Sequence, residues 1–369
     1  MSPLKCHFEQ IQVTLPSGVQ LITKPGIRGY PGLTPGLNVL LEYVGEGNGS
    51  LIDASGSASG YAMGINWDGP VTVLEPSRAA GICAAQMQSV GRRKILAGAI
   101  WDATPYSADA IVLIPQADKG TGRVEAELAG AYRALRKTGR LFFTIHKDLG
   151  AKRYEKLAKQ WFDTRLIGKR SGWRVVEGVR CDTPLEIRSP WIDFEAIGHD
   201  IKSRPGVFSA GKIDGGTSLL LDSIQDLPLE GREVLDLGCG YGLLGLFAGL
   251  RGAKVTALDD DWPSVDSTRS NFDRLSVNAR VLHSDLTSDL DPQERFDVVL
   301  INPPFHVGKS VQMDLPAAFI NAAYAHLRDG GELFLVANRE LAYERLLGVF
   351  AVTKKIADAR GFKVIRAQK

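Results

Sequence analysis

The sequence is poor in the features that mark membrane, disulfide-rich and metal-binding proteins. Its longest nearly apolar run is Leu243–Leu250, far short of the roughly 18 residues that cross a bilayer, and Met1–Gln10 has no apolar signal core. The four cysteines show no C-x-x-C spacing, and the six histidines show no metal-ligand spacing. We therefore expect a cytoplasmic protein with no membrane partner, no metal site and four buried free thiols.

Length and composition predict two ordinary globular domains. The chain has 369 residues, 44% of them hydrophobic and 23% charged, which excludes disordered and collagen-like classes. The net charge of +2 hides an asymmetry, because residues 1–190 hold 24 Lys+Arg against 17 Asp+Glu, whereas residues 191–369 hold 20 against 25. Residues 133–180 alone carry 14 basic and four acidic side chains. Such a stretch is either a solvated surface or a footprint for a polyanion such as nucleic acid.

The two halves of the chain resemble each other at a shift of 180 to 192 residues. Each copy alternates short Val/Ile/Leu runs with longer helical stretches, such as 125–137 and 316–327, which predicts a doubly wound, mostly parallel α/β sheet in each half. We place the domains at 1–188 and 189–369. The matching segments are 24–26 with 204–206, 50–53 with 233–236, 71–75 with 255–259, 109–115 with 297–303 and 131–142 with 323–334.

A glycine-rich turn follows an expected strand in the second half. Gly238, Gly240 and Gly242 allow positive φ and close approach of a ligand to the backbone. The stretch 240–245 also satisfies G-x-G-x-x-G, as a nicotinamide enzyme requires, but Asp236 would face the pyrophosphate with negative charge. A cationic cofactor without phosphate, S-adenosylmethionine, suits the position better.

Three carboxylates complete the expected cofactor site. Asp236 would attract the cationic groups, Asp259 would accept the two ribose hydroxyls, and Asp285 would accept an adenine amine. Each could singly be a loop cap. Their order along the chain, together with the glycines, favours a cofactor site with these six members: Asp236, Gly238, Gly240, Gly242, Asp259 and Asp285.

The stretch Asn302-Pro303-Pro304-Phe305 leaves the end of another expected strand. Two prolines remove backbone donors and hold rigid carbonyl acceptors at the ligand edge of the sheet. The Asn302 side-chain oxygen and the Pro303 carbonyl can accept both N–H groups of a planar amine, while Phe305 stacks on the attached ring. We expect Asn302, Pro303 and Phe305 to act in catalysis, and Asn302, Pro304 and Phe305 to bind the substrate.

These motifs carry a family resemblance over nearly the whole second half. The chain resembles the ribosomal RNA guanine-N2 methyltransferases of the RsmC/RlmG type, which implies two tandem Rossmann-like methyltransferase domains with a degenerate first copy, S-adenosylmethionine as cofactor and ribosomal RNA or a ribosomal subunit, the small one favoured, as partner. We expect the protein to be a monomer. The segments that carry the resemblance are 205–209, 212–214, 236–242, 283–285, 302–306 and 362–364.

The first copy departs from the active pattern. Alignment of the two loops puts Ser55, Ser57 and Ser59 at the three glycine positions and Ile114 at the position of Asn302. Side chains there would obstruct a cofactor, so we expect the first domain to be inactive and to bind RNA or support the second.

Three alternatives stay open at this point. The first is methylation of glutamine in a protein factor or of adenine in DNA, because N-P-P-[YF] specifies a planar amine rather than guanine. The second is a non-catalytic RNA-binding or assembly protein, and the third is a nicotinamide oxidoreductase. Asn302 and the two prolines after it oppose the last two, since neither uses an amine pocket.

Overall fold

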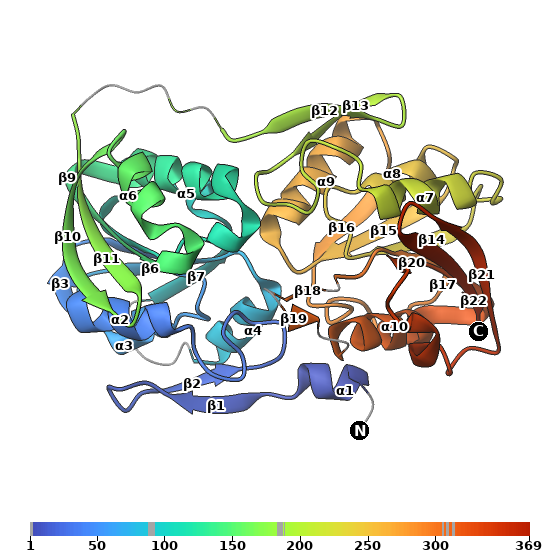
Figure 1. Ribbon diagram of the computed structural model, residues 1–369, viewed down its shortest axis with the longest axis horizontal. Helices are drawn as coiled ribbons and strands as arrows, with labels where there is room; N and C mark the ends of the chain where they lie inside the picture. Colours follow the sequence, from blue (N-terminus) through green and yellow to red (C-terminus); the bar gives the residue numbers. More distant parts are fainter. Residues whose placement is uncertain are drawn as a thin grey trace. The chain divides into compact units, whose positions relative to one another are not determined.

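The computed structural model describes residues 3–87, 93–182, 187, 189–304, 306–307, 310–311 and 314–369. The chain forms two compact units (Figure 1): the first unit is Glu9–Pro190, and the second unit is Met1–Phe8 together with Trp191–Lys369. The helix α1 (Pro3–Phe8) packs against α10 (Asp314–His326) of the second unit. The start of the chain is therefore part of the same core as its last 179 residues.

The first unit is built on a seven-stranded sheet of order β10-β11-β9-β8-β4-β6-β7. Five strands are parallel, and the hairpin β10–β11 runs antiparallel at one side. The strands are β4 (Leu51–Ala54), β6 (Val71–Glu75), β7 (Arg93–Ala97), β8 (Ala108–Leu113), β9 (Leu135–His146), β10 (Phe162–Arg170) and β11 (Trp173–Arg180).

Helices cover both faces of this sheet. Along β8, Ile111 and Leu113 pack in the core under α5 and α6, whereas Ala110 and Val112 pack under α2 and α3. This alternation is the period of two that a strand buried on both faces requires. The remaining elements are α2 (Pro35–Tyr43), α3 (Gly60–Gly64), α4 (Arg78–Gln86), α5 (Thr121–Ala134), α6 (Ala151–Ala158) and the strand pairs β1 (Ile11–Thr14) with β2 (Gln20–Thr23) and β3 (Glu46–Asn48) with β5 (Asn66–Asp68).

The second unit repeats the same topology. Its sheet order, β16-β15-β14-β17-β20-β22-β21, is that of the first unit read from β7 to β10. The prediction of two doubly wound, mostly parallel α/β sheets is thus confirmed. The strands are β14 (Glu233–Leu237), β15 (Lys254–Asp259), β16 (Ala279–His283), β17 (Phe296–Ile301), β20 (Leu327–Asn338), β21 (Val352–Ala359) and β22 (Phe362–Gln368).

Two cores lie on the faces of the second sheet. The helices α7 (Gly215–Ser223), α8 (Leu243–Gly249) and α9 (Trp262–Arg274) share one core, and α10 lies in the other, with Leu4 of α1 packed against it. The short pairs are β12 (Ile192–Ala196) with β13 (His199–Ser203) and β18 (His306–Val307) with β19 (Ser310–Val311).

Two smaller expectations need correction. The expected helices 125–137 and 316–327 end earlier, at Ala134 and His326, because Leu135 and Leu327 begin buried strands directly after them. Of the four cysteines, all free thiols, Cys83 and Cys239 are buried, but Cys6 is exposed. In the described part of the chain, no helix is long and apolar enough to cross a membrane, and no cluster of three His, Cys, Asp or Glu side chains could hold a metal ion.

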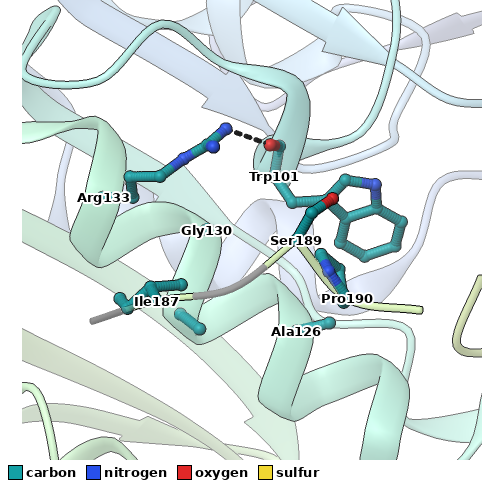
Figure 2. Close-up of a pocket in the computed structure, with 8 residues that line it drawn as sticks. Trp101, Ala126, Gly130, Arg133, Ile187, Ser189 and Pro190 are labelled. Atoms are coloured by element: carbon teal, nitrogen blue, oxygen red, sulfur yellow. Dashed lines mark hydrogen bonds between the residues drawn. The ribbon is translucent and has the colours of Figure 1, made fainter. Parts of the chain in front are cut away.

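The end of the first unit closes a small apolar pocket against α5 (Figure 2). Ile187, Ser189 and Pro190 line it together with Trp101, and the Arg133 guanidinium donates a hydrogen bond to the Trp101 carbonyl. The pocket holds about 20 Å³, room for about one water molecule. It therefore serves packing rather than ligand binding.

Candidate functional site

The expected site residues gather at one edge of the second sheet. Asp236 lies in β14 and Asp259 ends β15, while Asp285 follows β16 and Asn302 directly follows β17. Because these four strands are parallel neighbours, their carboxyl ends meet at the same edge. Residues spread over 67 positions of the sequence are thus brought to one site by the sheet order.

The glycine loop combines packing with open space. Gly238, Gly240 and Gly242 all have positive φ, at 79°, 59° and 86°. A Cβ at Gly238 would lie 2.9 Å from the Phe319 ring of α10, whereas one at Gly240 would meet, among the described residues, only Val207, at 3.9 Å. Gly238 therefore allows the loop to pack on α10, and Gly240 leaves the approach to the backbone open.

Asp259 holds this loop in place. Its Oδ2 accepts from the Gly240 amide and its Oδ1 from the Asp261 amide, both at 2.9 Å. Burial raises the pKa of Asp259 to about 7. The negative charges of Asp260 and Asp261 also raise this pKa, whereas the two backbone hydrogen bonds lower it. Each carboxylate oxygen can accept a further hydrogen bond, so Asp259 can bind hydroxyl donors while it orders the loop.

Asp236 is almost completely buried, with 1% of its surface exposed. Its Oδ2 accepts from the Gly245 amide at 2.8 Å, but its Oδ1 has no hydrogen-bond partner among the described residues. Burial raises the pKa of Asp236 to about 7. Buried carboxylate oxygens are normally satisfied, so this one marks a place where a donor or cation belongs.

Asp285 contacts a residue that sequence reasoning did not associate with the site. Its Oδ1 lies 2.7 Å from Nε2 of His7, which α1 carries to it across 278 residues of sequence. Both side chains are nearly buried, at 4% exposure each. No motif indicates this pairing, because it depends on α1 packing into the second unit.

Asn302 has a fixed amide orientation. Its Nδ2 donates to Asp214 Oδ2 at 3.2 Å and to Thr217 Oγ1 at 2.9 Å. The same Asp214 oxygen caps α7 by accepting from the Gly216 and Thr217 amides. Because a carboxylate oxygen only accepts, the amide NH₂ must face it, which turns the Asn302 Oδ1 acceptor away from this network. A rigid acceptor is what a planar amine substrate requires.

Of the neighbouring prolines, Pro303 is buried and Pro304 is exposed. Phe305, expected to stack on the substrate, lies outside the described residues, and its role stays a prediction.

The segment 204–214 connects the glycine loop with Asn302. Val207 lies beside Gly240, the Tyr241 hydroxyl donates to the Lys212 carbonyl at 3.1 Å, and the segment ends at Asp214. Phe208, next to Val207, is 58% exposed. In the sequence, Phe208 stands out only as part of a motif, whereas the structure shows that its ring is exposed beside the site.

The loop of the first unit corrects the alignment of the two copies. Positive φ occurs at Gly56, Ala58 and Ser59, not at Ser55 or Ser57. The Ala58 amide also donates to Glu75 Oε2 at 3.2 Å, as the Gly240 amide does to Asp259. By backbone conformation, Gly56 and Ala58 therefore stand where Gly238 and Gly240 do, and the serine alignment is wrong at these two positions.

The correction leaves the first site closed. Ala58 is 3% exposed and packs in a small core with Ile27 and Cys83, so its methyl group fills the place that stays open beside Gly240. Among the described residues of the first unit, this loop has no opening like the one beside Gly240.

Comparison with known proteins supports one family. Residues 198–366 match the family described as Methyltransferase small domain. The chain is 39% identical over 188 residues to ribosomal RNA small subunit methyltransferase C of Chromohalobacter salexigens and 36% identical over 185 residues to that of Salmonella newport. Those alignments cover 50% and 49% of this chain, and it spans only 56% and 53% of the two relatives.

A solved structure matches along the whole length. The T. thermophilus 16S rRNA N2 methyltransferase RsmC, in complex with AdoMet and guanosine, superposes with a TM-score of 0.89 at 33% identity, covering 100% of both chains. This likeness includes both units, whereas each curated alignment covers about half of the chain. The chain therefore belongs to the family of ribosomal RNA small subunit methyltransferases of the RsmC type.

Proposed function

We propose that this protein transfers a methyl group from S-adenosylmethionine to the exocyclic N2 amine of a guanine in small-subunit ribosomal RNA. The observation that carries the proposal is Asn302, whose amide is held by Asp214 and Thr217 so that Oδ1 is presented as an acceptor at the carboxyl edge of the sheet. The full-length likeness to RsmC supports guanine over glutamine or adenine as the target.

The described residues fit the cofactor on three counts. The partnerless Asp236 Oδ1 suits a cationic group, the open backbone at Gly240 admits close approach, and Asp259 suits vicinal hydroxyls. Asp285, with Oδ1 on His7, is assigned to the adenine amine. When bound, S-adenosylmethionine supplies an electrophilic methyl group on its sulfonium sulfur.

The chain supplies orientation and an acceptor rather than a strong base. The guanine amine is a poor nucleophile because its lone pair is delocalised into the ring. Asn302 Oδ1 and the Pro303 carbonyl accept its N–H groups, which favours positive charge on the nitrogen as the new C–N bond forms and the S–C bond breaks. The nitrogen then loses a proton to solvent, since a methylated ammonium of this kind is strongly acidic.

The two domains take different roles in this proposal. Residues 189–369, completed by α1, hold cofactor and target amine, and the rest of residues 1–188 supports them or binds RNA. The protein works as a monomer in the cytoplasm, where ribosomal subunits are its substrate.

The test is nucleoside mass analysis of small-subunit RNA incubated with the full-length protein and S-adenosylmethionine. Appearance of N2-methylguanosine, and its absence with Asn302→Ala, is the expected result. Methylated glutamine in a protein or methylated adenine in DNA, without methylated guanosine, would overturn the assignment.

A further inference from the structure

Several basic residues of segment 133–180 lie at the two opposite edges of the first sheet where its strands begin and end. Arg136 and Lys137 are near the start of β9, and Lys147 directly follows its end. The regularly paired part of β9, from Arg140 to His146, spans about 20 Å, and Arg136 lies before the irregularity at its start. Arg136 is also paired with Asp109 at 2.8 Å. The stretch is therefore two separate surfaces rather than one patch.

At the carboxyl edge these residues form a pocket of about 430 Å³. The end of β9, the start of α6 and the turn between β10 and β11 build it, three elements that Figure 1 shows side by side. This volume is in the range of small-ligand sites. The cationic residues that line it are Lys147, Lys152, Arg153, Lys169, Arg170 and Arg174.

The pocket carries an excess of positive charge. Arg170 is paired with Glu42, and Arg174 Nε lies 3.1 Å from a Glu155 oxygen. The three lysines that line the pocket make no ion pair with any described residue, and Arg153 contacts the Thr121 hydroxyl rather than a carboxylate. None of the described residues that line the pocket is acidic. Four cationic groups are thus available to an anion.

The aromatic residue of the pocket does not offer a stacking face. Trp173 is only 9% exposed, and a Cβ on Gly36 would lie 2.5 Å from its ring. Its ring also makes an edge contact with His146, with centroids 5.4 Å apart. Recognition here depends on charge rather than on base stacking, which indicates a phosphate-rich ligand read without regard to sequence.

The excess charge is specific to the first unit. At the equivalent edge of the second sheet, Arg339 and Lys355 both pair with Asp358, and Lys363 pairs with Glu344. The fold itself therefore does not require unmatched cations at this edge.

We propose that this pocket binds the phosphodiester backbone of the RNA substrate. The inference rests on the proposed function for the identity of the polymer, and it restricts the contact to the carboxyl edge of the first unit, leaving Arg136 and Lys137 outside. Phosphate contacts of this kind fix the position of an RNA without reading its bases.

The test compares two double variants of the full-length protein with equal loss of charge. Lys152→Gln with Lys169→Gln removes two pocket cations, and the control, Lys137→Gln with Lys159→Gln, removes two exposed lysines elsewhere in the same unit. Fluorescence anisotropy of a labelled oligouridine about 12 nucleotides long gives the affinity across a salt series. An oligoadenosine of the same length tests independence from base identity.

We expect the pocket variant to lower the slope of log affinity against log salt by about one unit per lost contact and to weaken binding at least about fivefold at low salt. The control should stay within about twofold of the original protein. Equal salt slopes for both variants, or a loss of affinity for only one of the two oligonucleotides, would overturn the proposal that the pocket binds the RNA backbone.

Two further measurements separate this inference from the proposed function. S-adenosylmethionine affinity, by titration calorimetry, and thermal unfolding should be unchanged in the pocket variant. A protein that methylates guanosine but shows equal slopes refutes only the pocket. A protein that binds RNA through the pocket but forms no methylguanosine refutes only the proposed function.

Discussion

Asp53 of the first unit and Asp236 of the second occupy the same place in the duplicated fold. In each, Oδ2 accepts a hydrogen bond from the backbone amide nine residues further on: Ala62 at 3.0 Å for Asp53 and Gly245 at 2.8 Å for Asp236. The other oxygen differs: Asp53 Oδ1 accepts from the Ser55 amide, whereas Asp236 Oδ1 has no partner among the described residues. The hydrogen bond of Oδ2 is therefore common to both copies of the fold. An Oδ1 without a partner among the described residues is found in the second copy, at the candidate site.

The amine loop differs in the same way. Ile114 replaces Asn302, and the Arg28 guanidinium donates to the Ile114 carbonyl at 3.0 Å and to the Pro115 carbonyl at 3.4 Å. The first copy therefore uses its own side chain to occupy carbonyls whose equivalents would serve a substrate. In the repeat, Phe208 is the counterpart of Arg28 and is exposed. In the first copy, groups of the protein itself thus occupy the acceptors that have no such partner among the described residues of the second.

The largest effect is expected when the Asn302 acceptor of the second copy is removed, since the first copy has the apolar Ile114 at this position. Asn302→Ala should lower turnover at least about a hundredfold while cofactor affinity stays within a few fold, because Asn302 acts on the amine. Single-turnover methyl transfer and titration calorimetry measure the two quantities. Equal loss in both would show that Asn302 holds the cofactor loop instead.

The next effect concerns the open space at the glycine loop. Gly240→Ala should weaken S-adenosylmethionine binding at least about tenfold, because its methyl group enters the cofactor approach, where Val207 is its only neighbour among the described residues. Gly231→Ala is the matched control, since it also has positive φ, 71°, with no atom of the described part of the chain within 4 Å of the added carbon. Both should lose about 1 kcal/mol of stability from backbone strain. Equal affinity in the two variants would contradict the assignment.

The pH dependence of cofactor binding tests the two raised carboxyl groups. Asp236 and Asp259 have a pKa of about 7; the cationic group of the bound cofactor favours the ionised form of Asp236, and its hydroxyl donors favour that of Asp259. Affinity should therefore be highest above pH 7 and fall as pH drops below it, by up to about tenfold per unit for each group. Calorimetric titrations between about pH 8 and pH 6 measure this, and Asp236→Asn should reduce the slope. A flat profile would show that neither carboxylate faces charge.

A smaller effect is expected at the counterpart of Arg28. Phe208→Ala should weaken binding of the RNA substrate by about 1 kcal/mol, or about fivefold, if the exposed ring stacks on a base. Phe208→Tyr keeps the ring and should restore the affinity, which a purely electrostatic contact would not explain. Cofactor binding should be the same in all three proteins.

The smallest effect is expected at His7. His7→Ala removes a neighbour 2.7 Å from Asp285 and should weaken cofactor binding by about three- to tenfold with little change in RNA affinity. His7→Gln, which keeps a donor, should restore part of the loss. A loss of thermal stability without any loss of cofactor affinity would show that α1 only covers the second unit.

Much of the fold and part of the site could be predicted from the sequence. The alternating apolar runs and the internal repeat indicated both sheets, and the acids and glycines that end strands indicated the carboxyl edge, because parallel strands place such residues together. The alignment of the two loops was wrong at Ser55 and Ser57. The loop of the first unit has one residue more between its aspartate and the first residue of positive φ, and one residue fewer later in the loop, so a sequence alignment without gaps pairs the wrong residues.

The sequence by itself determined the residue types at the site: an acceptor amide before two prolines, glycines that tolerate positive φ, and carboxylates at strand ends. Only the tertiary structure decided which of their atoms are available. Partners such as Asp214 for Asn302 and His7 for Asp285 lie 88 and 278 positions away along the chain. Hydrogen bonds and burial depend on distance in space, and chain packing alone sets that distance.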